Sequence, residues 1–319
     1  MNNLKKLGLT ALAASLVTTS VFAGALTVSG GASLSVKNTT GAKDPGTGKS
    51  FSMGNDITFS GSGELDNGLN VAVSFMIDEG DGASAAGAAN TGSVFDTHSV
   101  TLSSDALGTF VFSGEGGSSA QGAMDAGAAG NIYDSTTGIA DITPAASGDN
   151  SMFYTLPSFV DGVVLTASMS PGKGSTNTPT HGSLGVVYTG VEGLTLMLGQ
   201  GDSGANSAET TSTTMHAAYA IGSFTLAVAN TEADNESAVN REVDSYQLAY
   251  TLTDDMSVTY GSETFDLEGN AVDEEVAKLG FSYTTGGMTI GAATIESKGA
   301  GNTAGLTTNR WQLDLSFAF

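Results

Sequence analysis

The side chains best suited to catalysis or metal binding are few and scattered along the chain. There are three histidines, His98, His181 and His216, and no cysteine. No two histidines stand at the spacing of metal ligands, and no Gly-x-Ser-x-Gly element accompanies them to supply a nucleophile. The lack of cysteine removes thiolate nucleophiles and thiolate metal sites. These residues predict a protein that is not an enzyme.

Carboxylates are abundant, and their natural ligands are hard cations. Asp78, Glu79 and Asp81 stand close together around a glycine, and carboxylate and carbonyl oxygens suit calcium. Their spacing matches neither the twelve-residue EF-hand loop nor tandem glycine–aspartate repeats. We expect no cofactor, and calcium at these three residues stays open as an alternative.

The overall charge limits the partners of the chain. Thirty-three acidic residues against ten basic ones give a formal net charge of −23. Nucleic-acid binding requires lysine and arginine to neutralise phosphates, so this balance excludes it. It also argues against a basic surface that docks on anionic lipid.

The first residues have the pattern of a secretory signal peptide. Lys5 and Lys6 precede an apolar stretch from Leu7 to Val17, and Val21-Phe22-Ala23 offers a cleavage site. The apolar stretch is too short for a spanning helix, which needs about 20 residues. We therefore expect residues 1–23 to be a signal peptide, residues 24–319 to be the mature domain, and the protein to be exported.

Apolar residues alternate with polar or small residues along most of the chain. From Arg310 to Phe319 every odd position is large and apolar, which gives a strand one apolar face and one wet face. The same alternation recurs upstream, for example in 69–77, 163–169 and 246–252, and the strands number sixteen. No later apolar run is long enough for a spanning helix, so membrane insertion would require a closed barrel.

The connections between the expected strands alternate in length. Those after even-numbered strands are tight turns such as Asp66-Asn67-Gly68 and Glu192-Gly193. Those after odd-numbered strands are long, polar and glycine-rich, for example 38–50, 199–212 and 231–241. Short turns on one rim and long loops on the other are typical of transmembrane barrels. The fold predicted is all-β, a 16-stranded antiparallel transmembrane β-barrel with short periplasmic turns and long external loops.

The longest connection, residues 113–150 after the fifth strand, is expected to control the pore. A barrel of sixteen strands encloses an aqueous lumen, and a segment folded into it would narrow the path. An exposed surface loop is the alternative. The acidic residues that this segment would place at the constriction are Glu115, Asp125, Asp134, Asp141 and Asp149.

The chain resembles the Gram-negative general porins of the alphaproteobacterial type. The features that carry the resemblance are the signal peptide, the long fifth connection, the segment 150–159 (NSMFYTLPSF) and the terminal Phe319. The resemblance implies a homotrimer, an inward-folded third loop, and recognition of the terminal strand by the barrel-assembly machinery. It also implies a lumen-facing arginine directly before Tyr154, where this chain has Phe153.

Side-chain alternation predicts which charged groups line the lumen. Lys37 and Arg310 would share one wall, because the first and last strands pair when the barrel closes. The inward residues expected from the same alternation are Lys37, Asp56, Glu64, His216, Glu263, Lys278, Arg310 and Asp314. With few positive and many negative groups along the path, we expect mild cation selectivity.

Together these features predict an outer-membrane porin for passive diffusion of small hydrophilic solutes and ions. A substrate-selective channel is one alternative, and a structural surface, S-layer-like or adhesin protein is another. The expected partners are other copies of the chain, outer-membrane lipids and lipopolysaccharide, the barrel-assembly machinery and the solutes themselves.

Overall fold

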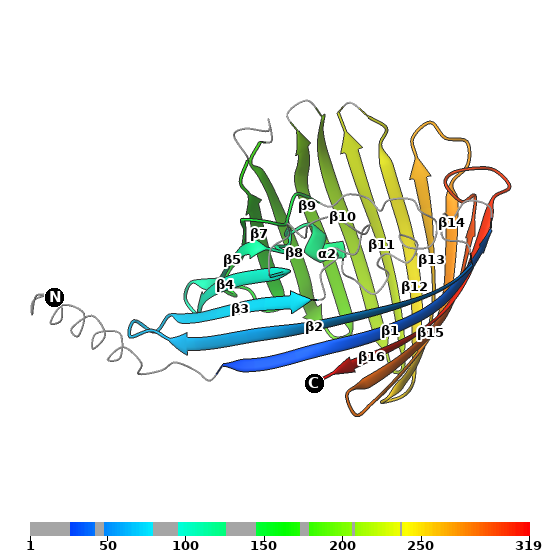
Figure 1. Ribbon diagram of the computed structural model, residues 1–319. Coiled ribbons are helices and arrows are strands. Elements are labelled where there is room, and N and C mark those ends of the chain that lie inside the picture. Colours follow the sequence, from blue (N-terminus) through cyan, green and yellow to red (C-terminus); the bar gives the residue numbers. More distant parts are fainter. Residues whose placement is uncertain are drawn as a thin grey trace, which may run out of the picture.

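The computed structural model is a closed antiparallel barrel of sixteen strands (Figure 1). It describes residues 26–41, 48–78, 95–125, 145–172, 179–205, 208–236 and 238–319. Every strand pairs with its neighbours in the sequence, and β1 pairs with β16 to close the ring. The predicted fold class is confirmed.

The strands β4 to β7 are shorter than the other strands of the barrel. Their bounds are β1 Thr27–Gly41, β2 Gly48–Glu64, β3 Asn70–Asp78, β4 Thr97–Ser104, β5 Gly108–Glu115, β6 Ser151–Thr155, β7 Val163–Ser170, β8 His181–Val191, β9 Leu194–Ala205, β10 Ala208–Ile221, β11 Phe224–Asn235, β12 Arg241–Thr253, β13 Met256–Leu267, β14 Glu274–Thr285, β15 Met288–Lys298 and β16 Thr307–Ala318. One helical turn, α2 (Gly122–Asp125), lies in the connection between β5 and β6.

The tight turns after even-numbered strands are as predicted. Gly68, between β2 and β3, has a φ of 79°, and Gly193, between β8 and β9, has a φ of 76°. Residues with a Cβ rarely adopt these angles, which explains why glycine follows the asparagine and the glutamate there. These turns fix the register of each hairpin and place one rim of the barrel close to the apolar band.

The long connections are shorter than predicted, because the strands continue into them. The stretch 199–212 was expected to be a loop, yet β9 and β10 pair through it as far as Ala205 and Ala208. β11 and β12 likewise extend into 231–241, and β1 and β2 into 38–50. These extensions carry Ser, Thr, Asn and acidic residues on both faces, so they show no apolar alternation although their backbones remain paired.

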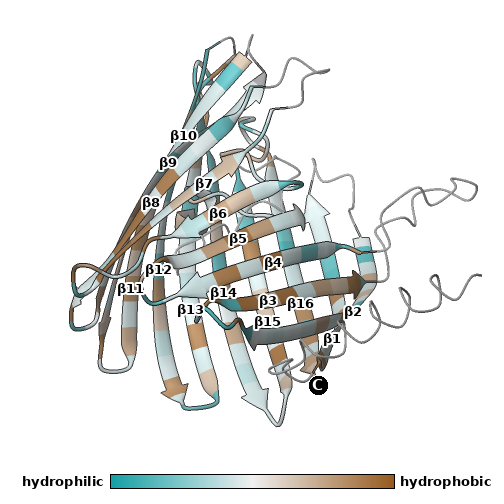
Figure 2. Cartoon of the chain, turned by 90° about the vertical axis from the view of Figure 1, so that its left-hand side faces the viewer, coloured by the Kyte–Doolittle hydropathy of each residue, from teal (hydrophilic) through white to brown (hydrophobic). Residues whose placement is uncertain are grey.

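The two faces of the wall invert the pattern of a soluble protein. Large apolar side chains such as Leu184, Ile221 and Phe224 are exposed on the outside, whereas Thr214, Ser212 and Glu263 are buried on the inside. Figure 2 shows hydrophobic residues as brown bands along otherwise pale strands. Among the described residues, no helix is long and apolar enough to cross a membrane, a finding that does not concern spanning strands.

The seam between the two ends of the chain is closed by backbone hydrogen bonds. Gly30 and Phe319 exchange N–H···O bonds of 2.9 and 3.0 Å, just beyond the β1–β16 ladder. A Cβ on Gly30 would lie 2.7 Å from the carbonyl oxygen of Asp56 and 2.9 Å from the Phe319 ring. The seam therefore requires a residue without a side chain at position 30.

Gly30→Ala should destabilise the barrel, because the added methyl group meets backbone atoms of β2 that cannot move freely. We expect a loss of about 1–3 kcal/mol, the usual cost of overpacking, measured by urea unfolding of the protein in lipid vesicles. Gly61→Ala is the matched control, since its Cβ would meet no atom closer than 4.0 Å. Equal stability of the two variants would show that the seam tolerates a side chain.

Candidate functional site

The connection between β5 and β6 enters the lumen and packs on the inner wall. The backbone N–H of Ala120 donates to the Oγ atoms of Ser168 and Ser183, both at 2.9 Å. Ala120 is fully buried, and α2 contacts β8, β9 and β10 (Figure 1). The third long loop is thus inward-folded in its described parts, as predicted.

Gln121 holds both arms of this loop against the wall. Its side chain is fully buried. Its Nε2 donates to Thr214 Oγ1 on β10 at 2.7 Å, and its Oε1 accepts from the N–H of Ala145 at 2.8 Å. The returning arm is fixed a second time, by the N–H of Ala146 donating to the carbonyl of Asp202 at 2.9 Å. One amide therefore joins the outgoing arm, the returning arm and the barrel.

Small residues on the wall make room for the loop. A Cβ at Gly199 of β9 would lie 2.8 Å from both Gln121 Cα and Met124 Cγ. A Cβ at Gly185 of β8 would lie 2.8 Å from the carbonyl oxygen of Ala120. Since backbone atoms on both sides limit any shift, only glycine permits this approach.

The predicted acidic residues of the constriction have different outcomes. Glu115 is the last residue of β5, so it stands where the strand ends, and its place at the constriction stays a prediction. The ladder to β4 continues through a bulge at His98, whose Nδ1 lies 3.9 Å from Glu115 Oε2. Asp149 is exposed beside β6, and Asp125 ends α2. Asp134 and Asp141 lie outside the described residues.

Three cationic side chains gather on the wall facing the loop. Lys37 of β1, Arg310 of β16 and Lys278 of β14 occupy inward positions, and Arg310 pairs in register with Thr39. Arg310 is buried, and its Nε donates to Thr39 Oγ1 at 3.2 Å. β1 lies halfway round the ring from β9, on which the loop packs. The expected sharing of one wall by Lys37 and Arg310 is what the register shows.

The predicted inward carboxylates also stand on luminal positions of their strands. Glu263 of β13 is buried, and Asp314 of β16 accepts a hydrogen bond from Gln312 Nε2 at 3.0 Å. Asp56 lies directly opposite Asp78 in the β2–β3 ladder. Glu64 ends β2 beside the short-turn rim.

His216 and Phe153 are the two remaining positions singled out by the sequence. His216 is buried on β10, two residues from Thr214 and on the same face. Phe153 of β6 stands at a luminal position between Val111 of β5 and Ser168 of β7. The positive charge that the resemblance places before Tyr154 is therefore absent from β6, and the described cations of the inner wall lie on β1, β12, β14 and β16.

Sequence reasoning missed a second segment that folds against the inner wall. Residues 299–306, between β15 and β16, include the fully buried Ala300. Glu274 Oε1 accepts from Ser297 Oγ at 2.5 Å, and its Oε2 accepts from the N–H of Gly301 at 2.9 Å. Asn302 Nδ2 donates to the carbonyls of Phe265 and Val272. Alternation along β14 could have found Glu274, since it shares a face with Lys278.

Below this segment lies a small apolar cluster inside the barrel. Its members are Ala233, Val243, Phe265, Val276 and Ile295, with Leu267 packed against them. All occupy luminal positions of β11 to β15, where polar residues were expected. The cluster gives the 299–306 segment an apolar surface to cover.

The described residues do not form a calcium site. Within the described ranges, no group of three or more acidic, histidine or cysteine side chains is arranged to hold a metal ion. Asp78 ends β3, whereas Glu79 and Asp81 lie outside those ranges. Calcium at these residues stays a prediction.

Comparison with protein families identifies the family to which this chain belongs. A family model described as Gram-negative porin matches residues 8–254. The chain belongs to the Gram-negative porin family. A search of curated proteins finds no matching relative.

Solved porin structures share the fold of this porin at low identity. An anion-selective porin from Comamonas acidovorans has a TM-score of 0.68 and 16% identity, covering 93% of this chain and 100% of its own. The trimer form of OmpT from Vibrio cholerae has a TM-score of 0.69 and 14% identity, covering 93% and 100%. A mutant of Rh. blastica porin has a TM-score of 0.64 and 14% identity, covering 92% and 100%.

Family and fold together make this protein an outer-membrane channel for passive diffusion. They point to a channel rather than an enzyme, and they favour a channel over the structural surface protein considered from the sequence. The loop held by Gln121 folds into the lumen of this channel, and its role as the constriction stays a prediction.

Gln121→Ala should loosen the loop in the lumen. The change leaves the Ala145 N–H without its acceptor and removes the bond to Thr214, at an expected cost of about 1–3 kcal/mol. Single-channel recordings in planar bilayers should show a larger mean conductance and more current noise. Gln200→Ala is the matched control, because Gln200 is exposed on the outer face, where its Nε2 donates to Thr213 Oγ1 at 3.2 Å. Identical recordings from both variants would contradict this role of Gln121.

Proposed function

We propose that this porin is a general-diffusion channel with a mild preference for cations. The observation that carries the proposal is the excess of carboxylates over cationic groups on luminal strand positions of the described chain. The carboxylates are Asp56, Glu64, Asp78, Glu263, Glu274 and Asp314, and the cations are Lys37, Arg241, Lys278 and Arg310.

The excess acts on ions through the field along the lumen. Carboxylates that line a narrow path with low-dielectric walls raise the local concentration of cations and lower that of anions. The porin from Comamonas acidovorans is described as anion-selective and has the same fold. Selectivity in this architecture therefore depends on the charges of the lining and not on the barrel.

Diffusion without a dedicated substrate is supported by the size of the luminal residues. On β8, β9 and β10 the inward positions near the loop are Ser183, Gly185, Gly199, Gly201, Ser212 and Thr214. Such positions offer weak, replaceable hydrogen bonds and no large binding surface. The Nε of Arg310 donates to Thr39 Oγ1. The luminal positions named above on β8, β9 and β10 hold no aromatic side chain that would extend a binding surface from Phe153.

We further infer that the protein assembles as a homotrimer. The support is the fold shared with OmpT of Vibrio cholerae, of which a trimer form is described. Openings that occur in steps of three in planar bilayers are the expected result. Consistent single steps from protein that native mass measurement shows to be one chain would contradict the trimer.

The preference for cations is tested by the reversal potential under a potassium chloride gradient. The unmodified channel should show a cation-to-anion permeability ratio above one, and Asp314→Asn should lower it because a luminal charge is lost. Lys49→Gln is the control, since Lys49 is exposed on the outer face of β2. A ratio below one for the unmodified channel would overturn the proposal.

Salt should weaken this preference. The Debye length falls from about 30 Å at 0.01 M to about 3 Å at 1 M ionic strength, so charges set back in the wall act on the path only in dilute salt. We expect the permeability ratio to approach one as the mean salt concentration of the gradient increases. A ratio independent of salt would show that selectivity comes from direct contact with a few groups.

A further inference from the structure

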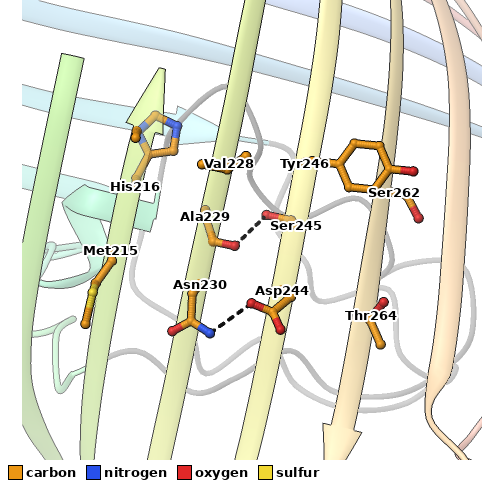
Figure 3. A pocket seen from close by; sticks show the side chains of 11 residues that line it. Met215, His216, Val228, Ala229, Asn230, Asp244, Ser245, Tyr246, Ser262 and Thr264 are labelled. Carbon is orange, nitrogen blue, oxygen red and sulfur yellow. Dashed lines mark hydrogen bonds between the residues drawn. The ribbon is translucent and has the colours of Figure 1, made fainter. Parts of the chain in front are cut away.

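The outer face of the barrel carries a groove of about 480 Å³ over β10 to β13. Figure 3 shows side chains that line it on these neighbouring strands. Met215 and Val228 stand on one side and Tyr246 on the other, each about half exposed. Between and beside them are the small residues Ala217, Ser262 and Thr264. We call this hollow the outer-wall groove.

The groove arises from the order of side chains across the strands. Ala217, Val228, Tyr246 and Ser262 follow one another in register from β10 to β13. Short side chains at both ends of this row leave space beside two larger ones. The next outward row toward the short-turn rim holds Tyr219 and Leu226, so the outer face beside the groove on that side is apolar.

The end of the groove toward the long-connection rim is acidic. Asn230 Nδ2 donates to Glu242 Oε1 at 2.7 Å and to Asp244 Oδ1 at 3.0 Å. This amide engages one oxygen of each carboxylate and leaves the other two oxygens for a ligand. Figure 3 shows Asn230 and Asp244 joined across β11 and β12 at this end.

A second hollow, of about 300 Å³, continues beyond these carboxylates. Glu232, Glu242 and Asp266 line it and lie directly opposite one another in the β11–β12 and β12–β13 ladders. Like charges in such positions repel, so a cation bound between them would be stabilised. Arg241 borders this hollow from the neighbouring strand position, which faces the lumen.

Apolar and acidic ends together match one kind of ligand. A molecule with a hydrocarbon chain and a cationic head would bury the chain beside Val228 and Tyr246 and present its charge to Asp244 and Glu242. The groove lies in the apolar outer face with its acidic end toward the long-connection rim, as a lipid of the outer leaflet requires. The absence of a metal-holding group among the described residues argues against a phosphate head bridged by a divalent ion.

We propose that the outer-wall groove binds an amine-headed lipid, with its ammonium group between Asp244 and Glu242 and its acyl chain against Val228 and Tyr246. The site rests on the outer-membrane location of this porin and is independent of its ion selectivity. A porin with unexpected selectivity would still bind the lipid, and a failure of lipid binding would leave the selectivity untouched.

The test uses the full mature chain refolded in phosphatidylcholine vesicles with trace spin-labelled lipids. Three lipids with the same labelled acyl chain carry an amine, a phosphocholine or a phosphate head. Electron paramagnetic resonance then gives the motionally restricted fraction of each. The amine-headed lipid should associate about fivefold more strongly than the phosphocholine lipid, as expected for one partly screened ion pair.

Two double variants separate a site from general electrostatics. Glu242→Gln with Asp244→Asn should reduce the preference for the amine to near one, while Asn230 can still donate to both amide oxygens. Glu275→Gln with Glu296→Gln removes the same number of charges from exposed positions of β14 and β15 and should leave the preference unchanged. Heat-modifiable mobility on gels confirms that each variant is folded.

Filling the groove supplies an independent readout. Ala217→Leu adds a side chain within the groove and should reduce the restricted fraction of the amine-headed lipid while every carboxylate remains. An equal preference in the Glu242/Asp244 variant and the unmodified protein would overturn the proposal. Stronger restriction of the phosphate-headed lipid, dependent on calcium and abolished by a chelator, would also overturn it in favour of a bridged anionic lipid.

Discussion

Pairing of the backbone in an environment without water is the constraint on which this structure depends. Every peptide N–H and C=O of a spanning strand needs a partner in hydrocarbon, and an open sheet would leave the outer edges of its two terminal strands unpaired. The β1–β16 ladder and the Gly30–Phe319 exchange remove both edges. Closure also separates two surfaces, one for lipid and one for water, and all functional side chains take their roles from this separation.

Inside the ring, polar residues do the packing that apolar residues do in a soluble protein. Ser168, Ser183 and Thr214 hold the intruding loop through Ala120 and Gln121. The close approach at Gly185 and Gly199 buries these bonds, so that losing one partner would leave a buried polar group unsatisfied. The exception is the apolar cluster around Phe265, which lies beneath the segment 299–306 and shows that part of the lumen is itself a small core.

The distribution of charge between the two faces connects the channel with its surroundings. Lys37, Lys278 and Arg310 face the lumen, where they oppose the wall that holds the loop. Glu232, Glu242 and Asp266 are one strand position out of phase with the luminal residues and therefore face outward. A shift of one residue along any of these strands would exchange the two sets, so register decides which charges act on ions and which act on lipid.

Alternation by itself determined the class of fold, the number of strands, the short-turn rim and the face of the wall residues that it named, because period two is a property of the strand and needs no partner. It placed Arg310 and Lys37 together through closure alone. The tertiary structure decided what alternation cannot express. Polar strand extensions such as 199–205 are held by pairing, Glu115 by a bulge at His98, and Gln121 by contacts with residues far away in the sequence. The outer-wall groove likewise exists only once Ala217 and Ser262 are brought into one row by four strands.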